Sequence, residues 1–410
     1  MINYCWNKNQ MKLQERVVLH CDANNFYASV EAVQSPNLKG KAVAVSGNPK
    51  KRTGIILAKN EIAKKFGVKT GEAIWQAKQK CPDLICVFPN FPLYESYSMK
   101  LRKIYSDYTD QIEPFGIDEC WLDVTSSLRL FGSGEKIAHQ IRERVKNELG
   151  ITVSVGVSFC KLFAKLASDM KKPDAVTMID RSNFKQKIYP LPITDIIGIG
   201  KRLEVRLHKL NIYNLGDLAN ADSEVLKRKF GIIGIELKEK LMGFDFDEVK
   251  KVSQPVKSVG NGTTTIIDIE TEEEVSRTIM FLCEKVASRL RKKNLLASGV
   301  GISLKTAQFK TFHHDKKLEI YTNRSDVLFD ECIKLLKSFW SFDTSLRSIR
   351  IRSFGLIDAN SHIQDTIFNQ TKKSGLGYGI DYLKNKYGES SIVIASTLSS
   401  NFISTDEKLN

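Results

Sequence analysis

The chain has 410 residues, of which 42% are hydrophobic and 27% are charged. This composition is too apolar for a disordered chain. No stretch approaches the roughly 20 consecutive apolar residues of a membrane span, so we expect folded domains without a membrane anchor. The length predicts about three domains. The 62 lysine and arginine residues exceed the 47 aspartate and glutamate residues, and the formal net charge of +15 favours a polyanionic partner, either nucleic acid or an acidic membrane.

The cysteines and the N-terminal region indicate the cellular compartment. The eight cysteines include no C-x-x-C pair, and the six histidines lack metal-ligand spacing, so we expect reduced thiols and no structural zinc. Residues 1–16 are polar and lack the apolar core of a secretory signal. We therefore expect an intracellular protein, in a bacterial cytosol or a nucleus.

Strands and helices alternate through the first 170 residues, which predicts an α/β core. We expect strands at 17–21, 42–45, 54–58, 112–115, 120–124 and 152–158. We expect helices near 24–31, 61–66, 71–80, 93–108, 134–149 and 162–170.

The composition changes after Pro190-Leu191-Pro192, where two glycines precede an amphipathic helix at 203–210 in what we interpret as a small helical domain. A charged linker follows. Beyond it, strands at 258–267, 299–306, 318–321 and 346–354 and helices at 272–293 and 325–341 give a β-α-β-β-α-β order, typical of an α+β unit. The polar tail contains a helix-like piece at 379–387.

Three carboxylates stand at the ends of predicted strands. Asp22 follows the first strand, and Asp118 with Glu119 opens a later one, so neighbouring strands could bring all three to one sheet edge. Clustered like charges raise each other's pKa, and hard oxygen ligands select Mg²⁺ or Mn²⁺. Two such ions suit phosphoryl or nucleotidyl transfer. The alternative is that these residues are ordinary surface acids at strand ends.

Three motifs carry a resemblance to a known family. They are Asp22-Ala23-Asn24-Asn25-Phe26-Tyr27-Ala28-Ser29-Val30-Glu31, then Gly116-Ile117-Asp118-Glu119-Cys120-Trp121-Leu122-Asp123-Val124, and Val155-Gly156-Val157-Ser158 with the following Lys161-Leu162 and Ala164-Lys165-Leu166-Ala167-Ser168-Asp169. In order and spacing they resemble the palm motifs of the Y-family translesion DNA polymerases, most of all the bacterial DNA polymerase IV branch. The resemblance covers residues 16–357.

The resemblance implies a right-hand polymerase with a ferredoxin-like palm, small fingers, a helical thumb with a helix-hairpin-helix, and a β-α-β-β-α-β little finger. The expected parts are an N-terminal extension (1–15), palm (16–33 and 91–180), fingers (34–90), thumb (181–246), linker (247–256), little finger (257–359) and tail (360–410).

The resemblance also implies an activity. Asp22, Asp118 and Glu119, with the carbonyl of Ala23, match the acids that bind two Mg²⁺ ions, and Mn²⁺ could replace them. The implied reaction is template-directed addition of deoxynucleotides to a primer, with low fidelity, across damaged template and without proofreading. The implied partners are primer-template DNA and deoxynucleoside triphosphates. We expect a monomer working at the bacterial nucleoid, with no membrane association.

Several residues match the family's nucleotide-binding positions. Tyr27 falls where the family places a steric gate against the 2′-hydroxyl of a ribonucleotide. The adjacent Phe26 is included in the nucleotide-binding set, although we expect its ring to lie in the core. Lys161 matches the palm lysine that reaches the triphosphate. In the fingers, Lys64 stands where arginine is common and Glu61 where tyrosine is common, so the fingers-side grip on phosphate departs from the family pattern.

The DNA-binding expectations fall in two places. Gly198-Ile199-Gly200-Lys201 resembles a helix-hairpin-helix, whose glycines let backbone N–H groups approach a phosphate, although a G-x-G pair is often a plain turn. In the little finger, Arg350 and Arg352 alternate along a strand and face one side, where they could line a groove of phosphates. Arg291, Lys305, Arg350 and Arg352 are the expected DNA-binding residues of this unit, against the alternative of a solvated charged face.

One motif in the tail suggests a further partner. Gln364, Ile367 and Phe368 resemble the peptide with which bacterial polymerases bind the sliding clamp, although Asp365 replaces the usual leucine. The alternative is a tail segment that merely packs. For the whole chain, two other functions remain open: a palm-type nucleotidyl cyclase, and a non-catalytic DNA-binding protein on the same scaffold.

Overall fold

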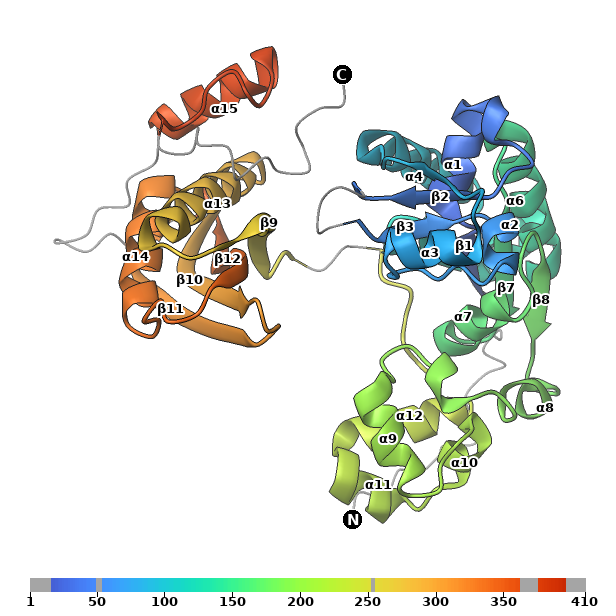
Figure 1. Cartoon of the computed structure of the whole chain (residues 1–410). Coiled ribbons are helices and arrows are strands. Elements are labelled where there is room, and N and C mark those ends of the chain that lie inside the picture. The colour runs from blue at the N-terminus through green and yellow to red at the C-terminus, as the bar shows by residue number, and fades with distance from the viewer. Residues whose placement is uncertain (1–15, 49–53, 252–254, 362–374, 396–410) are drawn as a thin grey trace. The chain divides into compact units, whose positions relative to one another are not determined.

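The computed structural model describes residues 16–48, 54–251, 255–361 and 375–395 (Figure 1). It divides into two compact units: unit 1 comprises residues 1–46 and 55–253, and unit 2 comprises residues 254–410 with 47–54. The α/β and α+β elements confirm the predicted fold class. No helix in the described ranges combines the length and apolar content that crossing a membrane requires.

A five-stranded sheet with the order β5-β6-β1-β7-β8 forms the centre of unit 1, and we call it the palm sheet. Its strands are β1 (Val18–Ala23), β5 (Ile112–Phe115), β6 (Glu119–Asp123), β7 (Val153–Ser158) and β8 (Val176–Ile179). β1 lies antiparallel between β6 and β7, and β8 runs parallel to β7. The edge strand β8 is absent from the prediction because its four residues carry only a short apolar signal between charged neighbours.

Helices cover both faces of the palm sheet. They are α1 (Phe26–Gln34), α4 (Phe91–Ser106), α5 (Leu128–Phe131), α6 (Gly134–Leu149) and α7 (Lys161–Met170), with a 3₁₀ turn at Thr125–Ser127. Alternate β1 residues face opposite sides. Leu19 and Cys21 pack in the core shared with α1, α4 and α6, whereas His20 contacts Ser168 of α7 on the other face. The face of β1 that carries His20 and Asp22 is therefore the face covered by α7.

Helix α7 touches the palm sheet through backbone atoms. A Cβ added at Gly156 of β7 would lie 2.0 Å from the carbonyl oxygen of Ala164 and 2.5 Å from the backbone nitrogen of Ser168. Because no side chain fits in that space, glycine at this position sets how close α7 lies to β7 and β1.

A smaller three-stranded sheet, with the order β3-β2-β4, forms the region predicted as fingers. Its elements are β2 (Val43–Ser46), β3 (Ile56–Lys59), β4 (Ile85–Val87), α2 (Glu61–Lys65), α3 (Ile74–Lys80) and the 3₁₀ turn Pro36–Leu38. Strand β4, which the sequence analysis does not predict, pairs parallel with β2. Its three residues are too few to show a period in the sequence.

The remainder of unit 1 is helical, as predicted, and we call it the thumb. It contains α8 (Phe184–Ile188), α9 (Lys201–His208), α10 (Leu215–Asn220), α11 (Ser223–Phe230), α12 (Ile232–Leu241) and the 3₁₀ turn Ile193–Asp195. Its apolar core includes Phe159 and Phe163 from the end of the palm sheet and from α7. The thumb is thus packed on the same helix that covers the palm sheet.

Unit 2 has the predicted β-α-β-β-α-β order. Its sheet runs β11-β10-β12-β9, and we call this unit the little finger. The elements are β9 (Ser258–Ile269), α13 (Glu272–Lys292), β10 (Leu295–Thr306), β11 (Thr311–Thr322), α14 (Ser325–Lys337), β12 (Leu346–Asp358) and α15 (Gly375–Tyr387). Helices α13 and α14 cover one face of the sheet, as Figure 1 shows. Strand β11 begins seven residues earlier than predicted because its first half is polar and exposed.

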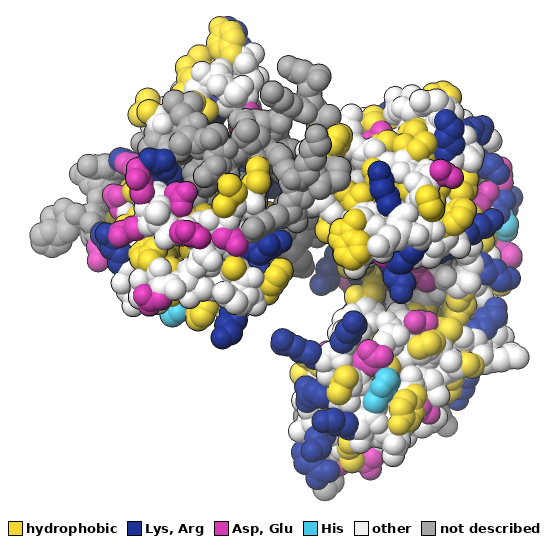
Figure 2. Space-filling model, in the orientation of Figure 1, with side chains coloured by type: hydrophobic (Ala, Val, Ile, Leu, Met, Phe, Trp, Pro, Cys, Tyr) yellow, Lys and Arg dark blue, Asp and Glu magenta, His cyan; other side chains and the backbone are white. Residues whose placement is uncertain are grey.

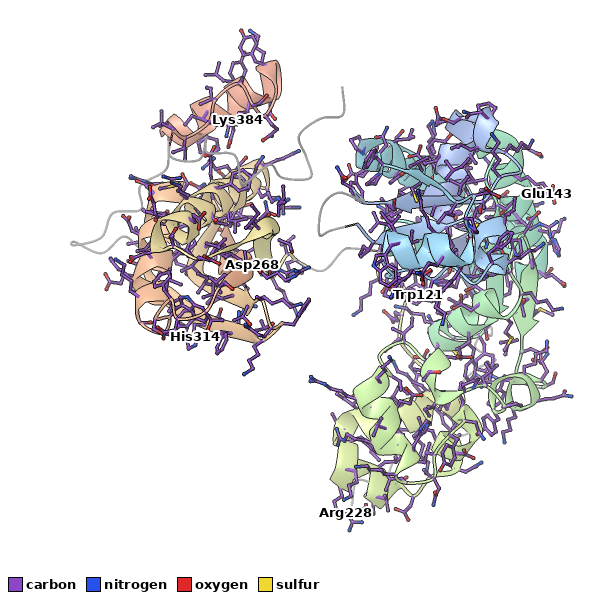
Figure 3. The ribbon with its side chains drawn as sticks, viewed as in Figure 1. Trp121, Glu143, Arg228, Asp268, His314 and Lys384 are labelled. Atoms are coloured by element: carbon purple, nitrogen blue, oxygen red, sulfur yellow. The ribbon has the colours of Figure 1, made fainter. Side chains whose placement is uncertain are left out.

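Helix α15 is held on α13 by charged side chains. The Arg291 guanidinium donates to Asp381, with its Nε 2.5 Å from Oδ2, and to the Asn323 carbonyl at 3.0 Å. Lys384 of α15, labelled in Figure 3, pairs with Glu284 of α13. Arg291 is only 6% exposed, so its guanidinium is committed to this contact. That Arg291 binds DNA stays a prediction, and its contact with Asp381 disfavours it.

Candidate active site

The three predicted acids lie together at one edge of the palm sheet. In the antiparallel pair β1 and β6, Asp22 stands directly opposite Glu119. Asp118 ends the turn between β5 and β6, where Gly116 adopts a φ of 81° that favours glycine. The Ala23 N–H donates to the Asp118 carbonyl at 3.1 Å, which ties the turn to the end of β1. The β5–β6 hairpin therefore places Asp118 beside Glu119, and the long-range pairing of β6 with β1 brings both to Asp22.

Two lysines from α7 and its C-terminal side approach these acids. The Lys165 ammonium lies 3.1 Å from Asp22 Oδ2 and 2.8 Å from Glu119 Oε2, and the Lys172 ammonium lies 2.7 Å from Asp22 Oδ2. Burial works to lower the pKa of Lys165, but the charge of Asp22 and the hydrogen bond to Glu119 outweigh burial and raise it. Both lysines therefore stay charged in this site.

His20 lies beneath the carboxylates and is fully buried. Its Nδ1 is 2.8 Å from Ser168 Oγ and its Nε2 is 3.2 Å from Glu119 Oε2. Ligand atoms of His20, Asp22 and Glu119 all lie within 4.8 Å of one another, so they form a candidate metal-binding cluster. Burial lowers the pKa of His20. A neutral imidazole can share this space with a carboxylate.

Asp118 differs from the other two acids because it has no ion-pair partner among the residues that the structure describes. Burial, and then the negative charges of Asp22 and Glu119, raise its pKa to about 6. For Glu119 burial works in the same direction, but contacts with His20 and Lys165 outweigh it and lower the pKa. The edge thus carries negative charge that protein cations compensate only in part.

Lys161, the residue predicted to reach the triphosphate, is engaged elsewhere. Its ammonium lies 2.6 Å from Glu113 Oε2 and 4.6 Å from the centre of the Trp121 ring, which Figure 3 labels in the palm. One helical turn later, Lys165 takes the place beside the acids. That Lys161 reaches the triphosphate stays a prediction, and its ammonium would have to leave Glu113 to do so. A sequence signal existed: Lys165 stands within the apolar run Phe163 to Ala167, where a charge requires an acidic partner.

Tyr27 lies in an aromatic cluster beside the acids. Its ring stacks on Tyr94, with centroids 4.3 Å apart, and meets the edge of Phe91 at 6.1 Å. The Tyr94 hydroxyl donates to Glu31 at 2.5 Å, which fixes the ring on which Tyr27 rests. Burial, and then the charge of Asp118, raise the pKa of Tyr27. The Phe26 ring is only 3% exposed and packs in the core, as expected, so its place among the nucleotide-binding residues stays a prediction that its burial disfavours.

The fingers helix α2 is linked to the palm at its first residue. The Asn25 side-chain amide donates to Glu61 Oε1 at 3.0 Å, and the Lys64 ammonium lies 3.5 Å from the same oxygen. Burial, and then the charge of Lys64, lower the pKa of Lys59. Lys64 is thus exposed beside a second cation, while Glu61 partly neutralises it.

In the thumb, the hairpin before α9 has the form expected from the sequence. Gly198 adopts a φ of 95° and Gly200 caps α9 without a side chain, and no atom lies near a Cβ added at either position. Lys201, the first residue of α9, is exposed. Figure 2 shows Lys and Arg side chains gathered over the thumb helices, and Figure 3 labels one of them, Arg228.

In the little finger, Arg350 and Arg352 lie on the same strand, β12. Lys305 of β10 places its ammonium 4.7 Å from the Phe309 ring centre at the sheet's end. The clamp-binding expectation for Gln364, Ile367 and Phe368 falls outside the described residues.

Family models match most of the chain in three segments. Residues 21–169 match the impB/mucB/samB family, residues 256–366 match the C-terminal domain of that family, and residues 181–212 match its HHH motif. The three segments cover the palm and fingers, the little finger, and the start of the thumb.

The chain is also similar to curated and solved proteins over nearly its whole length. It is 43% identical to DNA polymerase IV of Acetivibrio thermocellus, over 92% of this chain and 96% of that protein. It is 32% identical to DNA polymerase IV 2 of Bacillus subtilis, over 94% and 95%. A solved Y-family DNA polymerase chimera matches with a TM-score of 0.75 and 26% identity, over 83% of this chain and 99% of that one.

Proposed function

Because the chain belongs to the Y-family of DNA polymerases, and is a DNA-directed DNA polymerase, we propose that it extends a primer by two-metal nucleotidyl transfer centred on Asp22, Asp118 and Glu119. The observation that carries this proposal is the register of β1 and β6, which puts Asp22 opposite Glu119 with Asp118 at the adjoining turn. A general role in translesion synthesis fits this family. Low-fidelity copying across damaged template, without proofreading, is part of the proposal.

The residues at this edge suit two hard divalent cations. Carboxylate and carbonyl oxygens of Asp22, Ala23, Asp118 and Glu119 form the donor set that Mg²⁺ prefers, with Mn²⁺ as an alternative. The pKa of Asp118, raised first by burial and then by the charges of Asp22 and Glu119, supports this assignment because a bound cation would favour the ionised carboxylate. When bound, such ions activate the primer hydroxyl and stabilise charge on the leaving pyrophosphate. We assign His20 as the neighbour of Glu119 and not as a ligand, since Mg²⁺ favours oxygen.

The protein's own cations would neutralise the triphosphate. We propose that Lys165 and Lys172, in place of Lys161, supply positive charge from the palm, since their ammonium groups already lie on Asp22. Lys64 would act from the fingers as a point charge once a phosphate competes with Glu61 for it. Each of these ammonium groups would contact phosphate oxygens whose negative charge grows during nucleotidyl transfer. Cations held in place by the protein stabilise such growing charge most.

Tyr27 would select deoxyribonucleotides by shape. Its ring is backed by Tyr94, which is itself held by Glu31, so it cannot retreat from a 2′-hydroxyl without breaking the stack. A steric gate needs this rigid support, because a mobile ring could move aside and would exclude a ribonucleotide only weakly.

Two regions would bind the primer-template without recognising its base sequence. The Gly198–Gly200 hairpin offers backbone N–H groups and Lys201 at the start of α9, and the little finger offers Lys305, Arg350 and Arg352 on or beside its sheet. Contacts of this kind go to phosphates, so affinity would fall steeply with salt and vary little with sequence. We also propose, from the sequence alone, that Gln364, Ile367 and Phe368 bind a sliding clamp.

The test replaces the acids together. Primer extension with Mg²⁺ on undamaged template is expected to be lost in Asp118→Ala/Glu119→Ala, while primer-template affinity changes by less than about threefold. Glu143→Ala is the matched control, since it removes an exposed acid from α6 on the far side of the palm sheet's core (Figure 3). Synthesis that survives the double substitution would contradict the assignment of the site. Loss of synthesis in the control would show instead that removing any acid from the palm impairs the enzyme, so that the effect is not specific to Asp118 and Glu119.

A further inference from the structure

The little-finger sheet has one face without a covering element among the described residues. Val300, Ile302 and Ile351 point under α13 and α14 and are fully buried. The alternate residues on β10, β11 and β12 point the other way, and the first seven residues of β11 are all exposed. We call this the open face, and it is where Arg350 and Arg352 lie.

Glycines shape the open face so that charged side chains lie flat on it. A Cβ added at Gly301 would stand 2.0 Å from Asp315 Oδ1 and 3.1 Å from Arg352 Nε, so these two groups meet directly above the Gly301 backbone. On the other side of β12, a Cβ at Gly262 would lie 2.9 Å from the Cβ of Arg350. The absence of a side chain at Gly301 of β10 therefore lets Asp315 of β11 reach Arg352 of β12 across the intervening strand.

Asp315 is the acid at the centre of this arrangement. Its carboxylate accepts from both Arg352 Nε, at 3.3 Å, and Arg352 Nη2, which is a two-point contact. His313 Nε2 lies 3.2 Å from Asp315 Oδ1, and His313 Nδ1 lies 2.7 Å from Ser303 Oγ. Side chains from three of the four strands, β10, β11 and β12, thus meet around this carboxylate.

Arg350 provides an internal comparison two residues away. It is exposed on the same face and has no ion-pair partner among the residues that the structure describes. Arg350 and Arg352 thus lie on the same strand and face the same side, and Arg350 offers a full positive charge to the surface. The other is offset by an acid that would stand close to any phosphate bound at Arg352.

We propose that Asp315 lowers the affinity of the little finger for nucleic-acid phosphate by neutralising Arg352. This rests on the proposed function, in that the open face is taken to lie along the primer-template backbone. Arg350 then carries the phosphate contact on β12, and Arg352 contributes fully only when the acid is removed. A bound phosphate would have to approach the Asp315 carboxylate, and that repulsion opposes the attraction of Arg352.

The expected size follows from counterion release. Each phosphate that a protein cation neutralises adds about 0.9 to the slope of log affinity against log salt. If removing the acid gives Arg352 one such contact, the affinity ratio of Asp315→Asn to wild type would be about eightfold larger at 0.1 M salt than at 1 M salt. Asparagine keeps the shape of the side chain and removes only its charge.

The experiment is a double-mutant cycle on the full-length protein, with affinity for a fluorescent primer-template measured by anisotropy at several salt concentrations. The four proteins are wild type, Asp315→Asn, Arg352→Ala and the double variant. Asp326→Asn is the matched control, because it removes an aspartate that pairs with Arg324 at the start of α14, on the helix-covered side. Thermal melts check that each variant is folded.

The proposal expects Asp315→Asn to bind more tightly with a steeper salt slope, Asp326→Asn to bind as wild type, and the gain to vanish when Arg352 is alanine. Unchanged or weaker binding in folded Asp315→Asn overturns it, the latter because the acid would then be orienting Arg352. A gain that persists without Arg352 also overturns it. Arg350→Ala tests separately whether the open face binds DNA at all. If this variant leaves the affinity unchanged, the open face does not bind DNA. If it weakens binding, the open face does bind DNA, and the Asp315→Asn result then concerns Asp315 alone.

Discussion

Replacing Asp118 by asparagine is expected to stabilise the metal-free protein at neutral pH while abolishing synthesis. Burial and two neighbouring carboxylates raise the Asp118 pKa to about 6, so its ionised form is disfavoured in the folded state. A carboxyl with a raised folded pKa takes up a proton more readily when folded than when unfolded. The folded state is therefore penalised as pH rises through the interval from the unfolded pKa to about 6.

The shift from 3.8 to about 6 corresponds to an upper limit of about 3 kcal/mol at pH 7, falling to roughly half of that at pH 5. Partial solvent access and coupling with Glu119 reduce the observed value. Asparagine has no charge to lose, so the gain should be largest at pH 7. For a unit of the size of unit 1, each kcal/mol moves the melting temperature by about 2–4 °C.

The assay is calorimetry of both proteins in EDTA at pH 7 and pH 5, following the transition that belongs to unit 1. We expect Asp118→Asn to melt several degrees higher at pH 7, with a smaller difference at pH 5. Added Mg²⁺ should stabilise wild type and do less for the variant, because a ligand has been lost. Equal melting temperatures, or a difference that widens at pH 5, would refute the reasoning about trapped negative charge.

Three further substitutions have expected outcomes. Lys165→Ala should lower the rate of nucleotide incorporation about 100-fold, whereas Lys161→Ala should lower it less than about tenfold, and single-turnover extension compares them; the reverse order would return the role to Lys161. Tyr27→Ala should admit ribonucleotides, and Tyr94→Leu should do so in part by loosening the stack; unchanged sugar selection in both would remove the gate. Arg291→Ala should lower the stability of unit 2 by about 3–5 kcal/mol while the folded protein keeps its DNA affinity, as melts and anisotropy would show; a loss of affinity without loss of stability would restore Arg291 as a DNA contact.

The sequence predicted best where the determining contacts are local. Asp118 and Glu119 lie at a tight turn that opens a strand, so the hydrophobic pattern was enough to place them at a strand end. It left open whether that strand pairs with the end of β1 beside Asp22, as it does in the structure. The helices α6 and α13 were also placed within a residue or two because their apolar period runs over many turns. Family motifs then supplied the chemistry that spacing alone left open.

The sequence predicted less where a side chain finds its partner from far along the chain. The sequence around Arg291 suggests an exposed cation. Its burial becomes visible only when α15 packs on α13 and brings Asp381, 90 residues later in the sequence, into contact with it. Lys161 and Lys165 differ by one helical turn, so which of them reaches Asp22 depends on where the neighbouring Glu113 and Trp121 lie. Such choices are settled by tertiary packing and leave no period in the sequence.

Gly156 bears on catalysis without carrying any reactive group. Ordinary van der Waals contact needs 3.4 Å or more, and a methyl group here would stand 2.0 Å from the Ala164 carbonyl, so alanine would push α7 away from the palm sheet by about 1 Å or more. The ammonium of Lys165 moves with that helix, and a misplacement of about 1 Å can cost about 100-fold in rate. The space for a single hydrogen atom between β7 and α7 therefore sets the position of a charged group in the active site.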